Sequence, residues 1–384
     1  MKTAVFSIFL LASLLSAQPA LAVVDVESGP HMLGNDAAAP APGATQDGPP
    51  AEVESSRGVG DMTAYSRWPF DEGEARRRQE ETARALGLPV DSSNSIGMKL
   101  RLIPAGEFMM GSPEDEEGRS SDEGPLHRVR ITKPFYLGAC EVTVEQFRQF
   151  VAATGHVTDA ETDGRGGWGY TGVPERPFRR DPRYTWRDPG FSQGLDHPVV
   201  NVSWNDAVAF CAWLTRREGK TYVLPTEAQW EYACRAGTPT PFYHGGDAEG
   251  LAGVGNVSDL SANEKFALWM TLSKVDREKM GTASHRDGFV FTAPVGRFRA
   301  NAFGLYDMHG NVWEWCADWD AADYYRNSPV DDPAGPREGS SRIRRGGSWL
   351  HSAEYARSAQ RRRYPPTGRN SPIGFRVALE PNMP

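Results

Sequence analysis

One aromatic segment, residues 304–319, constrains the fold of this 384-residue chain more than any other stretch. It carries Trp313, Trp315 and Trp319. Large apolar side chains at alternating positions are typical of an extended strand, because successive side chains point to opposite faces. The oxygen-bearing side chains among them are of the kind that calcium prefers. Taken alone, the residues slightly favour a buried aromatic strand over a metal-binding loop. The polar members are Asp307, Asn311, Glu314 and Asp318.

The amino-acid composition limits the fold classes and the kinds of partner that this chain can have. The 40 glycines, 29 prolines and 11 tryptophans indicate a loop-rich fold rather than a helical bundle. The net charge of −8 argues against nucleic acid as a partner, because a phosphate-binding face needs a surplus of basic residues. A small molecule, a peptide or a protein in a surface cleft is the partner we expect. The oligomeric state does not follow from the sequence.

The N-terminus reads as a signal peptide over residues 1–22. Lys2 is followed by the apolar stretch 4–15 and by the small residues Ala20 and Ala22 at a cleavage site. The apolar stretch is shorter than the ~20 residues that span a membrane, and no later stretch is apolar enough to do so. We therefore expect a protein without a membrane span that is periplasmic or secreted.

Residues 23–93 are expected to form a disordered linker and a short charged helix. The early part is rich in Ala, Pro and Gly and buries too little apolar surface to offset its ordering entropy. The stretch 71–88 has a helical composition and ends at Gly87, a typical C-cap. The folded domain is expected over residues 94–380.

Short strands and three capped helices are predicted within that domain. Alternating apolar residues predict strands at 98–103, 108–112, 129–131 and 135–137. Thr143, Ser203 and Thr226 each precede a helical pattern, and their hydroxyls suit N-caps. The segment 159–196 has the length of a functional loop and carries Trp168, Tyr170, Tyr184, Trp186 and Phe191.

Four cysteines are present, and their spacing matches no metal-binding pattern. In an exported chain, four cysteines can form up to two disulfides, and the sequence does not distinguish the three possible pairings. Buried thiols without a disulfide framework are the favoured interpretation. The cysteines are Cys140, Cys211, Cys234 and Cys316.

Seven motifs in one order resemble the sulfatase-modifying-factor family, whose type member is the formylglycine-generating enzyme. They lie at residues 103–112, 141–143, 197–207, 224–233, 304–315, 345–349 and 374–376. The resemblance implies an α+β fold: a single loop-rich domain with little regular secondary structure, a variant of the C-type-lectin-like fold.

The resemblance also implies two calcium sites, each built from two side chains and two backbone carbonyls. Oxygen ligands from short loops suit calcium, and Val and Phe can contribute only their carbonyls. The first site would take Asn256, Val257, Asp287 and Phe289; the second would take Asp307, Gly310, Val312 and Glu314. Asp307 replaces the asparagine expected there, which keeps an oxygen ligand and adds charge.

The departure from the family pattern bears on function. In the type enzyme two cysteines after the Gly-Gly-Ser motif bind copper(I), which requires soft thiolates. Here His351 and Ala356 stand at those positions, and no cysteine lies in the segment. The sequence therefore argues against copper and against formylglycine generation by the known mechanism.

Five residues of this segment are the catalytic candidates: Ser348, Trp349, His351, Tyr355 and Arg357. Three roles are open to His351, namely a general base, a metal ligand or a hydrogen-bond partner of the substrate, and a histidine without chemistry is equally compatible. Trp349 is expected in the core. The arginines 361–363 have the charge to hold an anion, although a solvated charge run is the commoner case.

Three functions remain. An exported oxidoreductase or maturation enzyme with cysteine-independent chemistry is slightly favoured, and the family has a precedent in a periplasmic oxidase-like protein of pyoverdine maturation. A non-catalytic module that binds peptide, protein or glycan through the aromatic segment 159–196 is the alternative. Formylglycine generation on sulfatases ranks last.

Overall fold

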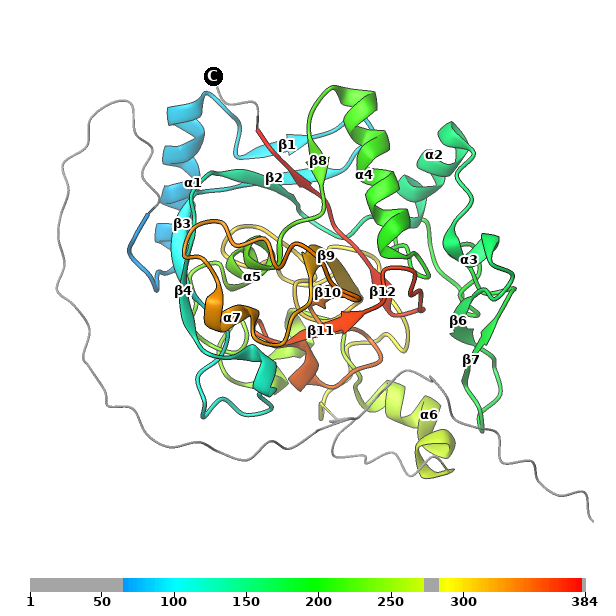
Figure 1. Cartoon of the computed structure of the whole chain (residues 1–384). Coiled ribbons are helices and arrows are strands. Elements are labelled where there is room, and N and C mark those ends of the chain that lie inside the picture. Colours follow the sequence, from blue (N-terminus) through cyan, green and yellow to red (C-terminus); the bar gives the residue numbers. More distant parts are fainter. Residues whose placement is uncertain (1–64, 273–282, 382–384) are drawn as a thin grey trace, which may run out of the picture. The chain divides into compact units, whose positions relative to one another are not determined.

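The computed structural model describes residues 65–272 and 283–381 (Figure 1). The predicted signal peptide and the early part of the predicted linker lie outside these residues. The charged helix lies inside them as α1 (Glu72–Leu86), with Gly87 as its left-handed C-cap. The Gln79 amide of α1 donates hydrogen bonds to the carbonyls of Leu102 and Phe303, so this helix packs on the domain.

A five-stranded sheet joins the two ends of the domain. Its order is β1 (Asp91–Ser93), β2 (Lys99–Ile103), β5 (Phe135–Gly138), β13 (Ala378–Leu379) and β8 (Tyr222–Val223). The C-terminal strand β13 pairs with both β5 and β8, in antiparallel register. Strand β1 pairs with β2 and begins three residues before the domain start expected from the sequence, because its Asp-Ser-Ser sequence carries no apolar signal.

A second, four-stranded sheet carries the tryptophan segment. Its order is β11 (Arg361–Tyr364), β10 (Arg342–Arg345), β9 (Trp313–Trp319) and β12 (Ile373–Gly374). Trp313 and Trp315 are fully buried in β9, which confirms the buried aromatic strand. Two separate hairpins complete the strands: β3 (Gly106–Met110) with β4 (His127–Ile131), and β6 (Gly167–Tyr170) with β7 (Phe178–Asp181).

The three helix starts predicted from cap residues are confirmed. Helices α2 (Val144–Thr154), α4 (Trp204–Glu218) and α5 (Glu227–Arg235) begin after Thr143, Ser203 and Thr226. Each cap hydroxyl accepts from the backbone N–H three residues on, and the side chain there returns a bond to the cap's own N–H. The remaining helices are α3 (Asp159–Thr162), α6 (Leu260–Leu272), α7 (Tyr324–Asn327), η1 (Ser121–Glu123), η2 (Ala248–Gly253) and η3 (Ala353–Ala356).

The observed architecture is the predicted α+β class, with short strands, few long helices and much irregular backbone between them. All four cysteines are free thiols, and Cys211, Cys234 and Cys316 are buried. Within the two described ranges, no helix combines the length and the apolar character that crossing a membrane requires.

Candidate functional site

A tight turn after β10 brings the candidate residues together. Gly346 and Gly347 have φ angles of 98° and 74°, in the left-handed region that favours glycine. A Cβ on Gly347 would lie 2.8 Å from the carbonyl oxygen of Tyr355 and 2.9 Å from the Cα of Ala356. The close approach therefore requires glycine, and it packs Ser348 against the segment that carries Tyr355.

Buried ion pairs hold this turn in place. Arg345, the last residue of β10, is fully buried between Glu227 and Glu231 of α5. Arg361 of β11 binds the same Glu227 through two hydrogen bonds of 2.8 Å. A buried charge is costly unless it is paired in this way. Arg361 thus has a structural partner, and its guanidinium is not available to hold an anionic substrate.

Ser348 and His351 form a hydrogen-bonded pair at the centre of the site. Ser348 Oγ lies 2.7 Å and Trp313 Nε1 lies 3.3 Å from Nδ1 of His351. The indole nitrogen can only donate, so Nδ1 is the acceptor and the imidazole proton resides on Nε2. Nε2 contacts no hydrogen-bond partner among the described residues.

The environment keeps His351 uncharged. Burial, reinforced by the nearby guanidinium groups of Arg344 and Arg362, lowers the pKa of His351 to about 3. No carboxylate of residues 65–272 or 283–381 bonds to its ring to stabilise an imidazolium, and Ser348 is completely buried. This arrangement differs from a Ser-His-Asp triad, in which a carboxylate supports the protonated base. Of the three roles open to His351, the geometry favours a hydrogen-bond donor to substrate through Nε2.

The other candidates divide into two groups. Tyr355 is half-buried, with its ring centroid 5.3 Å from that of His351, so it belongs to the site. Trp349 is buried within an aromatic cluster and contacts Phe291 and Phe191 at 5.2 and 5.6 Å between centroids. Its place is the core, as expected.

Arg357 lies in a buried polar cluster. Its guanidinium binds both carboxylate oxygens of Glu123, at 2.8 and 2.7 Å, and also contacts Glu116. Although burial opposes the charged form of Glu123, the bonds from Arg357 lower the pKa of that carboxyl group. The guanidinium donors of Arg357 are all occupied. Arg357 therefore has a positioning role beneath the turn and does not belong to the groups around His351.

The thiols do not restore a copper site. Ala356 is fully buried, and its carbonyl accepts from His309 Nδ1 at 2.7 Å. Cys234 comes within 3.6 Å of Ser358 Oγ, but burial raises the pKa of its thiol to about 12. Across residues 65–272 and 283–381, no group of three or more His, Cys, Asp or Glu side chains is arranged to hold a metal ion.

The first predicted calcium site has the donor atoms that such an ion needs. Asn256 Oδ1 and Asp287 Oδ2 are buried and have no hydrogen-bond partner. The carbonyls of Val257 and Phe289 accept no hydrogen bond from a described residue. Burial raises the pKa of Asp287 to about 7, and the neighbouring Asp259 adds to the effect. Unsatisfied buried oxygens are costly unless a ligand completes them, so these four residues fit calcium.

The second predicted site fits in a modified form. Asp307 Oδ1 is buried and unpartnered, but both carboxylate oxygens of Glu314 bind Arg376 at 2.6 Å. Glu141 supplies another buried, unpartnered oxygen, Oε2, beside Asp307. In the sequence, Glu141 stands out only as the first residue of the family motif at 141–143. Its position between an apolar strand and a helix cap gave no signal for a ligand, whereas the structure offers it in place of the saturated Glu314.

The backbone ligands expected for the second site follow Asp307 in the same loop. Gly310 has a φ of 90°, and Val312 is buried immediately before β9. Burial raises the pKa of Asp307 to about 6, and burial together with the charge of Asp307 raises the pKa of Glu141. Two carboxyl groups that resist ionisation in this way are what a divalent cation would neutralise.

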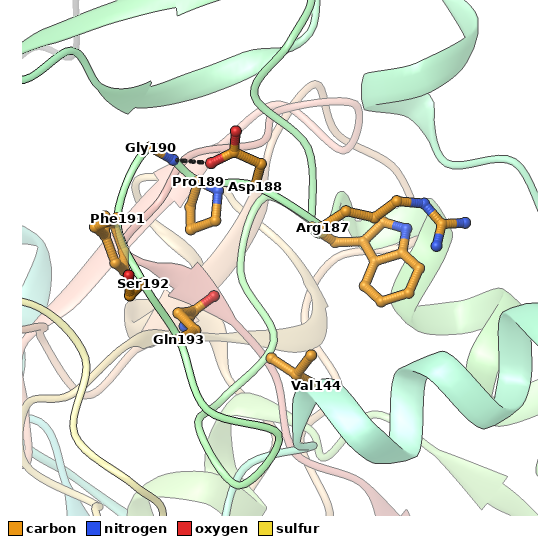
Figure 2. A pocket seen from close by; sticks show the side chains of 9 residues that line it. Val144, Arg187, Asp188, Pro189, Gly190, Phe191, Ser192 and Gln193 are labelled. Carbon is orange, nitrogen blue, oxygen red and sulfur yellow. Dashed lines mark hydrogen bonds between the residues drawn. The ribbon is translucent and has the colours of Figure 1, made fainter.

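A separate cavity lies in the long aromatic segment. It has a volume of about 440 Å³ and is lined by Val144 of α2 and residues 186–193 (Figure 2). The guanidinium of Arg187 stacks on the ring of Trp186, at 4.3 Å. Gln193 Oε1 is buried there without a partner, while its amide nitrogen donates to Pro198 O and Thr292 Oγ1.

The sequence profile of the Sulfatase-modifying factor enzyme 1-like domain matches residues 91–381. This chain belongs to the sulfatase-modifying-factor family. The match covers both sheets, the Ser348–His351 pair and all eight predicted calcium ligands. The family profile also begins at the first residue of β1, in agreement with the structure.

Two individual relatives illustrate the similarity. A formylglycine-generating enzyme of Thermomonospora curvata is 35% identical over 77% of this chain and 97% of its own length. The Inactive C-alpha-formylglycine-generating enzyme 2 of Mus musculus is 32% identical over 73% of this chain and 86% of its own.

Solved structures support the same assignment. PvdO from Pseudomonas aeruginosa superposes with a TM-score of 0.60 at 34% identity, over 76% of this chain and 98% of PvdO. Treponema denticola variable protein 1, with a TM-score of 0.53 at 22% identity over 76% of this chain and all of its own, shares the fold alone. The fold of the family is thus present in this chain.

Proposed function

We propose that this protein is an exported, calcium-binding member of the sulfatase-modifying-factor family, an oxidoreductase or maturation enzyme whose chemistry does not depend on cysteine. One observation carries the proposal. His351 stands at the first copper-ligand position, where burial keeps it neutral and Ser348 and Trp313 orient its ring, while Ala356 occupies the second position. A neutral imidazole and a methyl group do not replace two thiolates.

The polar groups that converge on His351 support an enzyme over a passive scaffold. Perturbed titratable groups with specific neighbours cluster at functional sites. In this account His351 orients the substrate through its Nε2 proton, and Tyr355 provides a ring face beside it. The oxidation itself would move two electrons and two protons from the substrate to dioxygen, which would be reduced to hydrogen peroxide.

Calcium, if bound, would supply structural cross-links between loops. Asn256, Val257, Asp287 and Phe289 would hold the first ion, and Asp307, Gly310 and Val312 with Glu141 would hold the second. Neither set includes His351 or Ser348, so the ions would stabilise the loops without entering the chemistry. The export part of the proposal rests on the predicted signal peptide at residues 1–22.

Two assays test the proposed function. In the first, the purified protein is incubated with copper(I) and a sulfatase peptide that carries the target cysteine, and we expect no aldehyde product by mass spectrometry. In the second, it is incubated with small molecules and peptides exported by cells that lack the gene. We expect a product two hydrogens lighter than its substrate, dependent on dioxygen and absent with His351→Asn. Aldehyde formation in the first assay, or no such product in the second, contradicts the proposal.

A second candidate function, a binding module, is favoured by the cavity at residues 186–193. Its aromatic wall and the unpartnered Gln193 Oε1 suit a ligand with hydroxyl or amide donors, such as a glycan or a peptide. Glycan-array and peptide-array binding with the wild type and with Trp186→Ala tests it. Specific binding that Trp186→Ala abolishes, together with no oxidised product, would establish the module in place of the enzyme.

A further inference from the structure

Arg344 and Arg362 stand directly opposite each other on neighbouring strands. They are registered partners in the antiparallel β10–β11 pair, and both are half-buried. Neither forms an ion pair with any carboxylate in the described part of the chain. The arginines beside them do find partners: Arg345 and Arg361 bind Glu227, and Arg363 lies 3.7 Å from Asp320.

This arrangement is unfavourable without a counter-ion. Like charges opposite each other across a sheet destabilise the pair, and a desolvated cation without a partner costs more still. Nε of Arg344 is buried and has no hydrogen-bond partner. Burial and the charge of Arg362 lower the pKa of Arg344 to about 10. Arg344 lies over the ring of Tyr364, at 4.8 Å, but neither guanidinium has a carboxylate counter-charge among the described residues.

The two arginines close a ring of groups around the candidate site. Arg344 lies 5.0 Å from the ring of Trp313, whose centroid is 5.5 Å from that of His351. His351 is 5.3 Å from Tyr355, and the guanidinium of Arg362 lies 4.9 Å over the Tyr355 ring. These five residues, here called the arginine–aromatic cluster, combine two cations, the free Nε2 proton of His351, the half-buried ring of Tyr355 and the fully buried ring of Trp313.

We propose that the arginine–aromatic cluster binds the carboxylate of a planar organic acid. The two guanidinium groups and the Nε2–H of His351 supply donors and positive charge, which a carboxylate accepts in its plane. The half-buried ring of Tyr355 offers a face against which the flat body of the acid can pack, whereas Trp313 is fully buried and contributes only to the wall behind. A neutral analogue of the same shape lacks the charge that compensates the arginine pair.

This inference rests on the proposed function, because it takes the Ser348–His351 site as the place where substrate binds. It names the chemical class of that substrate, an aromatic carboxylic acid. Binding is measured without turnover, so the two claims fail separately. Carboxylate binding without an oxidised product would leave the cluster assigned and refute the enzyme.

Calorimetric titration of the full-length mature protein with benzoate at pH 7 tests the inference, with benzamide and inorganic phosphate as comparison probes. We expect benzoate to bind and Arg362→Gln to weaken binding about 10-fold or more, the effect of losing a charge-assisted hydrogen bond. Arg363→Gln removes the same charge from the adjacent, exposed residue and is expected to leave the affinity unchanged. Arg344→Lys, which keeps the charge but loses the planar fork, is expected to weaken binding less than Arg362→Gln.

Four results would overturn the inference: no binding of benzoate, equal binding of benzamide, a preference for phosphate over benzoate, or equal losses in Arg362→Gln and Arg363→Gln. Circular dichroism and thermal melts establish that each variant is folded. Arg362 and Arg363 both have exposed atoms on a surface strand, so their variants provide the decisive comparison even where Arg344→Lys is poorly folded.

Discussion

The hydroxyl of Ser348 donates a hydrogen bond of 2.7 Å to Nδ1 of His351. Because Nδ1 accepts this bond, the neutral imidazole carries its own proton on Nε2. Trp313 Nε1 approaches the same nitrogen at 3.3 Å and cannot accept, which excludes the opposite tautomer. The pair therefore resembles the serine and histidine of a hydrolase in proximity only. Without a supporting carboxylate, the histidine presents a donor to the site rather than a base.

The low pKa of His351 predicts a pH-dependent stability. Its pKa is about 3 in the folded protein, against about 6.5 in an unfolded chain, so the unfolded state binds the proton more readily between these values. Stability is therefore lost as pH falls below about 6.5, by roughly 2 kcal/mol between pH 7.5 and pH 5 from this group. In His351→Asn, the amide oxygen replaces the Nδ1 acceptor and nothing titrates.

Chemical denaturation of the wild type and of His351→Asn at several pH values measures the difference. The buried carboxyl groups contribute equally to both proteins and cancel. His127→Asn, at the start of β4, serves as a control for the loss of a histidine outside the site. An identical pH dependence in the wild type and in His351→Asn would contradict the buried, neutral histidine.

Restoring the two cysteines should restore copper(I) binding. The double variant His351→Cys with Ala356→Cys places thiolates at both family positions, and soft thiolates are the ligands that copper(I) requires. Competition with a coloured copper(I) chelator should give about one ion per chain for this variant and none for the wild type. The matched double variant with serine at both positions should also bind none; tight binding by the wild type would refute the assignment of these positions.

The buried pair between Glu314 and Arg376 predicts a large effect on stability. Both side chains are fully buried, and both carboxylate oxygens accept at 2.6 Å. Arg376→Met should lower the free energy of unfolding by about 3–5 kcal/mol, because it leaves an unpaired buried carboxylate. Arg130→Met, which breaks the exposed pair with Asp331, should cost much less in the same urea titration. Equal losses would show that Glu314 does not depend on Arg376.

Calcium should stabilise the protein through Asn256. At a concentration about 100-fold above its Kd, one bound ion adds about 3 kcal/mol to the free energy of unfolding. Asn256→Ala should lose the first site and a corresponding part of the calcium-induced rise in Tm. Asn205→Ala, an exposed asparagine at the start of α4, should respond to calcium as the wild type does. An undiminished response in Asn256→Ala would remove Asn256 from the ligands.

Glu141 provides a separate test of the second site. Glu141→Gln keeps an oxygen but removes the charge beside Asp307, so it should weaken one calcium site by titration calorimetry and leave the other intact. Glu145→Gln, a partly exposed carboxyl group four residues further on, is the matched control. If Glu141→Gln binds calcium with wild-type affinity at both sites, Glu141 is not a ligand.

Local rules account for the parts of the fold that the sequence predicts well. The caps Thr143, Ser203 and Thr226 act within four residues of the helix start, so their signal survives without tertiary information. The alternation of Trp313 and Trp315 likewise identifies a strand from its own side chains. Elements whose signal is tertiary were missed. The hairpin β6–β7 has short, Gly- and Arg-rich strands, and α6 lies in a stretch for which no element was predicted.

The candidate site likewise combines residues with a local sequence signal and residues whose signal is tertiary. The position of His351 relative to the Gly-Gly-Ser motif is local, so the sequence identifies it. The sequence alone does not single out Arg344, because its significance depends on lying opposite Arg362, 18 positions further along the chain, and only the strand register reveals this pairing. Glu141 and Asp307 are distant in sequence, and their proximity depends on how the loops close.

Elemental analysis of the purified mature protein, prepared without chelators, tests the central claim most directly. We expect about two calcium ions per chain, because oxygen donors for calcium are present. We expect neither copper nor iron in stoichiometric amounts, because a thiolate pair is absent. Stoichiometric copper or iron would indicate a histidine-based redox metal site and would contradict a metal-free site at Ser348 and His351. Absence of calcium from the folded protein would contradict the two loop sites.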